Sequence, residues 1–409
     1  MLIAEEALDD STGHYLDYIE DILSACPGMG IEAQVAVHQE ATAEVLSRLP
    51  AIPVFQSNAW KNRVDHNGGP LRRIREILQH NLRLANSLKK TLKTHGPFDL
   101  VLAPSNLVDH ALGHYLVARW LQRRALKTHY ILIFLDAQGV EQPNGQLVFP
   151  KRSLLLRWFM RLFRKMLGDG RATFCAESPG MARHFQAFSG LPFQLVPHVV
   201  RFPLEELERK RHQHRDRPRS MTFGYFGFNR YDKGGDLLQR AIHILQSRTP
   251  LDFRFLIQWT RDFHLPDNSL SRLDQDLRKD PRITYITSVF SPENYLDYLS
   301  QTDCIVLPYR RCFYRERLSR VAIDAAICGI PFIAPEGTWL ETFQASYGAG
   351  TTFLDEDPAS LAKALLTCLQ HQKEHSTEAS SKMSIAQLEF GPQKFIEAIL
   401  SFTRLEIRC

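Results

Sequence analysis

The chain has 409 residues, of which 44% are hydrophobic and 23% charged, with a formal net charge of +5. This composition excludes a disordered, collagenous or membrane-spanning protein, and the length predicts two domains, because a single hydrophobic core stops growing at roughly 300 residues. The small net charge gives no reason to expect a nucleic-acid partner.

The cysteines and the first residues indicate where the protein works. Seven cysteines are scattered along the chain without any Cys-x-x-Cys pair, which is typical of reduced thiols in the cytoplasm. The N-terminus has no basic region followed by an apolar core, and no run of about 18 apolar residues occurs. We therefore expect a cytoplasmic protein without signal peptide or transmembrane helix.

Short apolar runs alternate with segments of helical period along the whole chain, which predicts an α/β fold with parallel sheets. A charged stretch at 204–220 predicts a linker. We expect a first domain at 1–203 and a second at 221–389. The predicted strands are 1–4, 33–37, 100–103, 129–135, 172–175 and 194–196 in the first domain, and 222–226, 253–258, 283–286, 304–307 and 331–334 in the second.

Two histidines follow the predicted strand at 100–103. His110 and His114 stand one helical turn apart, a spacing that can hold a metal ion, but no third ligand is adjacent in the sequence. We therefore predict no metal site.

The segment 151–167 is strongly apolar and also basic. Arg157, Arg161, Arg164 and Lys165 fall on one helical stripe, and Trp158 is among the apolar residues. Such a helix is typical of contact with an anionic membrane surface. The alternative is a helix that covers a sheet and carries its arginine stems at the border.

The second half contains four features in a fixed order. A strand is followed by a loop with Gly227, Arg230 and Lys233, and a later strand ends in Pro-Tyr. Two carboxylates, Glu316 and Asp324, are eight positions apart, and an alanine-rich helix closes in Gly-x-Pro. Cations and backbone amides at a strand-to-helix turn can bind a diphosphate.

This layout, over roughly 222–366, resembles the C-terminal domain of retaining GT-B glycosyltransferases with a Glu-x7-Glu motif. The resemblance implies two Rossmann-like domains that face across a cleft, with residues 390–409 crossing back onto the first domain. It also implies a nucleoside-diphosphate sugar donor of UDP or GDP type, a glycan or lipid-linked acceptor, and no cofactor.

The resemblance also implies roles for single residues of the second half. Glu316 would contact hydroxyls of the donor sugar and Asp324 the ribose. Ser319 and Arg320 would present the amides of a helix N-terminus to the diphosphate, beside Lys233 and Arg230. Asp324 stands where the family has glutamate, and Ser319 where glycine is common. The alternative for the two carboxylates is a surface ion pair with nearby arginines.

In the first half the resemblance brings a glycine-containing loop to the donor phosphate or the acceptor, which makes Gly13 and His14 candidates. The alternative is an ordinary helix cap by Ser11 or Thr12. We interpret His110 as a residue that orients the acceptor. Asp136, at the end of a predicted strand, is a weaker candidate.

The resemblance thus implies a glycosyltransferase that moves a sugar with retention of configuration. Polysaccharide biosynthesis is the expected context, and Glu316, His110, Lys233 and Arg230 are the residues expected to act in the reaction. Two other readings stay open: a sugar-nucleotide epimerase or phosphorylase, and a non-catalytic partner in a polysaccharide-assembly complex.

Overall fold

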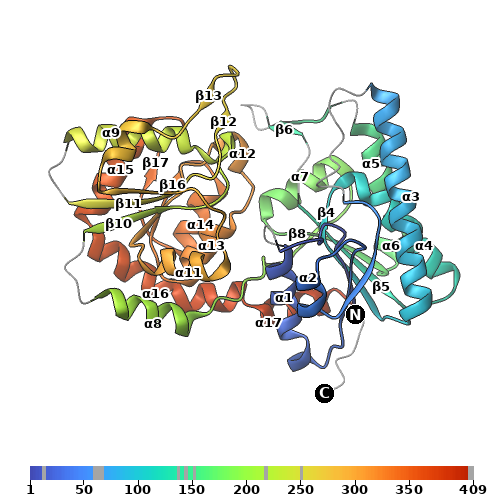
Figure 1. The fold of residues 1–409 in the computed structure, drawn as a ribbon. Coiled ribbons are helices and arrows are strands. Elements are labelled where there is room, and N and C mark those ends of the chain that lie inside the picture. The colour runs from blue at the N-terminus through green and yellow to red at the C-terminus, as the bar shows by residue number, and fades with distance from the viewer. Residues whose placement is uncertain are drawn as a thin grey trace. The chain divides into compact units, whose positions relative to one another are not determined.

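A computed structural model of the chain describes residues 1–11, 15–58, 69–135, 139–141, 146–150, 153–215, 220–248 and 252–403. The chain divides into two compact units, residues 1–199 with 392–409, and residues 200–391. Each unit is a parallel sheet between helices (Figure 1). No helix among the described residues is long and apolar enough to cross a bilayer.

The first unit contains a seven-stranded sheet in the order β3-β2-β1-β4-β5-β8-β9. All of its strand pairs are parallel. The strands are β1 Leu2–Ala4, β2 Gln34–His38, β3 Ala51–Phe55, β4 Leu100–Asn106, β5 His129–Phe134, β8 Ala172–Ala176 and β9 Gln194–Leu195; a hairpin pairs β6 Val140–Glu141 with β7 Leu147–Val148. The helices are α1 Tyr15–Ala25, α2 Ala43–Arg48, α3 Pro70–His95, α4 Ala111–Arg123, α5 Leu154–Arg161, α6 Arg164–Gly168, α7 Pro179–Ser189 and α17 Pro392–Ser401, with 3-10 turns η1 Pro27–Met29 and η2 Val108–His110.

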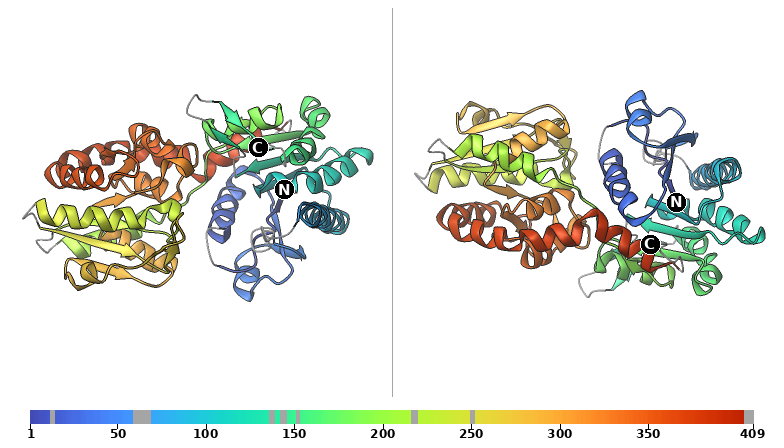
Figure 2. Two further views of the ribbon diagram at one scale, coloured as in Figure 1. Left: turned by 90° about the horizontal axis from the view of Figure 1, so that it is seen from above. Right: turned by 90° about the horizontal axis from the view of Figure 1, so that it is seen from below.

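Alternate side chains of these strands enter different cores. Leu2 packs in a cluster with α3, α4 and α5, whereas Ile3 packs on the opposite face with α1 and α17. Figure 2 shows α17, in red, beside α1, in blue, and the two helices are in contact. Residues 390–409 were expected with the first domain. The structure assigns residues from 392 onward to the first unit, whereas Phe390 ends helix α16 of the second unit.

The second unit contains a six-stranded parallel sheet in the order β14-β11-β10-β15-β16-β17. The strands are β10 Met221–Tyr225, β11 Phe253–Gln258, β14 Ile283–Ile286, β15 Cys304–Val306, β16 Phe332–Pro335 and β17 Thr352–Phe353; a hairpin pairs β12 Phe263–His264 with β13 Leu270–Ser271. The helices are α8 Leu204–Arg215, α9 Gly235–Arg248, α10 Gln275–Lys279, α11 Pro292–Ser300, α12 Arg311–Tyr314, α13 Arg320–Ile327, α14 Trp339–Tyr347, α15 Pro358–Gln370 and α16 Gln372–Phe390, with a 3-10 turn η4 Tyr231–Lys233.

Residues 204–215, expected within a linker, form helix α8 of the second unit. Leu207 is fully buried in the core shared with α11, α13 and α16. Arg211 donates a hydrogen bond of 2.9 Å to the carbonyl oxygen of Cys328, and Lys210 pairs with Asp297 at 3.4 Å. Most charged side chains of α8 lie on its outer face, while Leu207, Lys210 and Arg211 face the unit, so the second unit begins at Val200 instead of 221.

The basic segment expected as one helix at 151–167 contains two, α5 and α6, within its described part from residue 153. Leu156, Phe159 and Phe163 lie in the core of the first unit. The guanidinium of Arg157 lies over the ring of Phe188 at 5.4 Å. The segment thus covers the sheet, which is the alternative considered from the sequence, and its possible membrane contact stays a prediction.

Candidate functional site

The best-supported site of the second unit lies where its strand order reverses direction. From β10 the chain runs outward to β11 and β14 on one side, and then to β15, β16 and β17 on the other. In open α/β sheets, ligands bind beyond the carboxyl ends of the strands at such a switch point. The segments that leave β10 and β15 contain most of the residues expected to act on the donor.

Two glycines shape the turn between β10 and α9. Gly234 has a φ of +67°, and a Cβ atom there would overlap the carbonyl oxygen of Pro308, so only glycine fits this position. Gly227 has a φ of +116° with open space around its missing Cβ, and its amide donates to Gln258 at 2.7 Å. The backbone at Gly227 is therefore accessible, although its amide already has a partner.

Arg230 forms a two-pronged ion pair inside this turn. Its Nε and Nη2 donate to the two carboxylate oxygens of Asp232 at 2.9 and 2.8 Å. Burial alone would raise the pKa of Asp232, but the hydrogen bonds and charge of Arg230 lower it overall. The Arg230 side chain is still 44% exposed, so it can bind an external anion without leaving Asp232.

Lys233 lies on an aromatic platform that the sequence did not predict. Its ammonium is 3.8 Å from the ring centroid of Tyr309 and 5.1 Å from that of Tyr314. Burial, with the nearby charge of Arg230, lowers the pKa of Lys233 well below its ordinary value. The one sequence signal for Tyr309 was the Pro-Tyr pair that follows the predicted strand at 304–307. A bound diphosphate would offset both effects by adding negative charge beside the ammonium.

The expected helix start near Ser319 is present as the N-terminus of α13. Ser319 has extended backbone angles and precedes Arg320, the first residue of α13, but its hydroxyl makes no capping bond. Burial raises the pKa of Tyr309, and Ser319 is among the neighbours that moderate the shift. Lys233, Tyr309 and the start of α13 thus form one cluster with Arg230.

The two carboxylates of the motif lie in different environments. Glu316 is half-buried between α12 and α13. Asp324 is buried in α13, where Arg320 donates to one oxygen and the Tyr295 hydroxyl to the other, both at 2.9 Å. The ion pair considered from the sequence is therefore present for Asp324, although inside the unit. A ribose contact by Asp324 would compete with these two partners.

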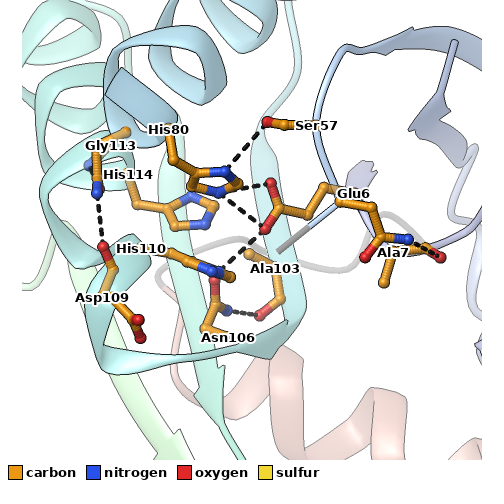
Figure 3. Close-up of polar contacts among 12 residues, drawn as sticks. Glu6, Ala7, Ser57, His80, Ala103, Asn106, Asp109, His110, Gly113 and His114 are labelled. Atoms are coloured by element: carbon orange, nitrogen blue, oxygen red, sulfur yellow. Dashed lines mark hydrogen bonds and ion pairs between the residues drawn. The ribbon is translucent and has the colours of Figure 1, made fainter. Parts of the chain in front are cut away.

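The first unit contains a buried cluster at its own switch point, between β1 and β4 (Figure 3). The Glu6 carboxylate, just after β1, lies 3.1 Å from Nδ1 of His110 in η2 and 3.1 Å from Nε2 of His80 in α3. Nδ1 of His80 lies 3.1 Å from the Ser57 hydroxyl. His110, expected to orient the acceptor, is thus buried and bonded to Glu6. His80 and Glu6 were not singled out from the sequence.

His114, one helical turn after His110, lies beside this cluster but has a different partner. Nδ1 of His114 is 2.7 Å from the hydroxyl of Tyr130. Burial, followed by the charge of His110, lowers the pKa of His114 to about 3, so this imidazole is neutral at physiological pH. Gly13, His14 and Asp136 lie outside the described residues.

Comparison with known proteins supports the fold over the whole chain. A glycosyltransferase from Rickettsia africae is 12% identical with a TM-score of 0.64, covering 98% of this chain and 96% of that one. Sucrose-phosphate synthase from Thermosynechococcus elongatus is 15% identical with a TM-score of 0.62 and the same coverage. HepE of Anabaena, solved with UDP and glucose, is 16% identical with a TM-score of 0.61 and 98% of each chain covered.

A family comparison adds the class of enzyme. Residues 219–371 match the model of the family described as glycosyl transferases group 1. The chain is a glycosyltransferase with the GT-B fold. No curated protein matches the sequence. The family match lies within the second unit of this glycosyltransferase and includes Lys233, Glu316 and α13, so the resemblance seen there in the sequence is confirmed at the level of the enzyme class.

Proposed function

We propose that this glycosyltransferase transfers a sugar, with retention of configuration, from a nucleoside diphosphate to a hydroxyl of a glycan or lipid-linked acceptor. The observation that carries the proposal is the cluster at the switch point of the second unit. Lys233 lies there beside Arg230 and over the Tyr309 ring, which also neighbours Ser319 at the N-terminus of α13. Two cations and a helix N-terminus are suited to a diphosphate.

The second unit would carry most of the work on the donor. Lys233, Arg230 and the amides of Ser319 and Arg320 would neutralise the leaving diphosphate, while Glu316 would hold sugar hydroxyls. The bond from the anomeric carbon to phosphate oxygen breaks, the bond to the acceptor oxygen forms, and the acceptor proton passes to the diphosphate. HepE of Anabaena was solved with UDP-glucose, which makes UDP-sugars the first donors to test.

The test combines binding with product analysis. Thermal-shift screening against UDP-, GDP- and ADP-sugars should identify one base, because a ligand of the folded state raises the melting temperature by mass action. With that donor, Lys233→Met and Glu316→Gln should each lower kcat/KM by about 100-fold or more. Lys279→Met, which removes an exposed lysine of the same unit, is the control.

The outcomes separate the proposed reaction from its alternatives. A labelled acceptor glycoside supports transfer, whereas conversion of the donor without a glycoside indicates an epimerase. Nucleotide binding without turnover, unchanged by either substitution, would favour a non-catalytic partner protein.

We also propose that helix α5 contacts an anionic membrane, where a lipid-linked acceptor would be found. Leu154 and Trp158 are 58% and 54% exposed, although the rest of the helix packs on the core. Basic residues of the same segment, Arg161, Arg164 and Lys165, are exposed and available to lipid phosphates.

A further inference from the structure

The cluster of Glu6, His80 and His110 in the first unit points to a metal site. Their ligand atoms all lie within 4.8 Å of one another, and no other such group occurs among the residues that the structure describes. The three side chains come from the loop after β1, from α3 and from η2 (Figure 3). We propose that they bind one divalent transition-metal ion of the zinc class.

The chemistry of the ligands selects the kind of ion. Two imidazole nitrogens and one carboxylate oxygen form the set found at many zinc sites, whereas Ca²⁺ and Mg²⁺ prefer oxygen ligands alone. Three protein ligands leave a fourth position for water, as at zinc sites that keep one position open. Glu6 would neutralise one of the two positive charges of the ion inside this buried site.

The distances from Glu6 fit this ion with little movement. In a tetrahedral site with bonds of about 2.0–2.1 Å, neighbouring ligand atoms lie about 3.3–3.4 Å apart. One carboxylate oxygen of Glu6, Oε1, is 3.2 Å from His80 Nε2 and 3.1 Å from His110 Nδ1, and all three ligand atoms lie within 4.8 Å of one another. A widening of about 0.1–0.3 Å at the two Glu6 contacts, with the two imidazoles turned toward the ion, would therefore admit it.

The Ser57 hydroxyl already holds the His80 ring in the orientation that a metal ion requires. The Ser57 hydroxyl lies 3.1 Å from Nδ1 of His80, on the side of the ring opposite to Glu6. When the ion takes Nε2, the imidazole proton moves to Nδ1 and donates to Ser57 Oγ, so no atom of the ring loses its partner. Such partners orient metal-binding histidines and increase metal affinity by about 10- to 100-fold.

The position of the cluster gives the site a place in the enzyme. It lies at the switch point of the first unit, where open α/β sheets bind ligands. The ion would fix η2 and the loop after β1 to α3, and so shape the carboxyl edge of this sheet. The inference does not depend on the proposed sugar transfer.

The test measures metal content and metal affinity of the full chain, purified without a polyhistidine tag. We expect about one zinc ion per chain by elemental analysis, and visible absorption bands of nitrogen-coordinated Co²⁺ after substitution with that ion. Glu6→Gln and His80→Ala should each lower bound zinc at least tenfold, and Ser57→Ala should weaken zinc binding by about tenfold.

A matched control is available in the same unit. His198 Nδ1 and Glu177 form another partly buried imidazole–carboxylate pair, 2.7 Å apart, that belongs to no three-ligand group among the described residues. His198→Gln should leave the zinc content unchanged. If a variant does not fold, titration of the metal-free wild type decides: zinc should raise its melting temperature. Background zinc content in the wild type together with no response to added zinc would overturn the proposal.

Discussion

Two arginines of the second unit have different partners and therefore different tasks. Arg310 is buried, and its Nη2 pairs with Asp236 at 2.7 Å while its Nε pairs with Glu356 at 2.9 Å. Its guanidinium also lies 3.7 Å from the ring centroid of Tyr231. The Arg310 guanidinium thus makes its contacts inside the unit. Among the described residues Arg230 pairs with one carboxylate, that of Asp232, and its side chain is 44% exposed, so it is the arginine with capacity left for a ligand.

We predict opposite consequences for the two substitutions. Arg310→Met leaves Asp236 with only Arg240 and should lower the free energy of unfolding by about 3 kcal/mol, as expected for a broken buried ion pair. Arg230→Met removes the main partner of the buried Asp232, but the Arg230 side chain is itself partly exposed, so this substitution should cost less, about 1–2 kcal/mol, while it weakens nucleotide binding by about tenfold. Chemical denaturation and calorimetric titration with the preferred nucleotide measure both effects. Equal stability losses with unchanged nucleotide affinity would contradict this division.

At the scale of single elements, the sequence predicted most strands of both sheets. Continuous apolar runs predicted both ends of β11 and β14 correctly, and they predicted the ends of most other strands within one or two residues. β3 was not among the predicted strands. It contains Pro53, and the structure places β3 at the edge of its sheet, where proline is tolerated. Glu6 and His80 could not be paired from the sequence, since 74 positions separate them and only the fold of β1 and α3 brings them together.

At the same scale, the exposed apolar residues of α5 make the membrane contact testable. Leu154→Ser with Trp158→Ser should lower binding to vesicles containing phosphatidylglycerol by at least tenfold, because both side chains would otherwise enter the interface. Flotation of the protein with vesicles measures this, and added salt should weaken wild-type binding. Leu78→Ser with Leu82→Ser, on the exposed apolar side of α3, is the comparison. Loss of binding only in the α3 pair would assign the contact to α3.

At the scale of the whole molecule, each unit has its own cores. Every core cluster among the described residues draws from one unit only, with α17 supplying Phe395, Ile396 and Ile399 to the first. Each unit also has its own candidate site at its own strand switch point. In the second unit this is the cluster of Arg230, Lys233 and the N-terminus of α13, and in the first unit it is the cluster of Glu6, His80 and His110. Stability and ligand binding should therefore be linked unit by unit.

This organisation predicts two unfolding transitions with different ligand responses. The preferred nucleotide at 100 times its Kd should stabilise the second unit by about 2.7 kcal/mol, and zinc should stabilise the first unit, because each ligand binds one folded unit. Differential scanning calorimetry should show each ligand moving a different transition, and hydrogen exchange in β10 and β4 assigns the two. Lys233→Met should remove only the nucleotide response and His80→Ala only the zinc response. A single transition moved by both ligands would show that the two units unfold as one.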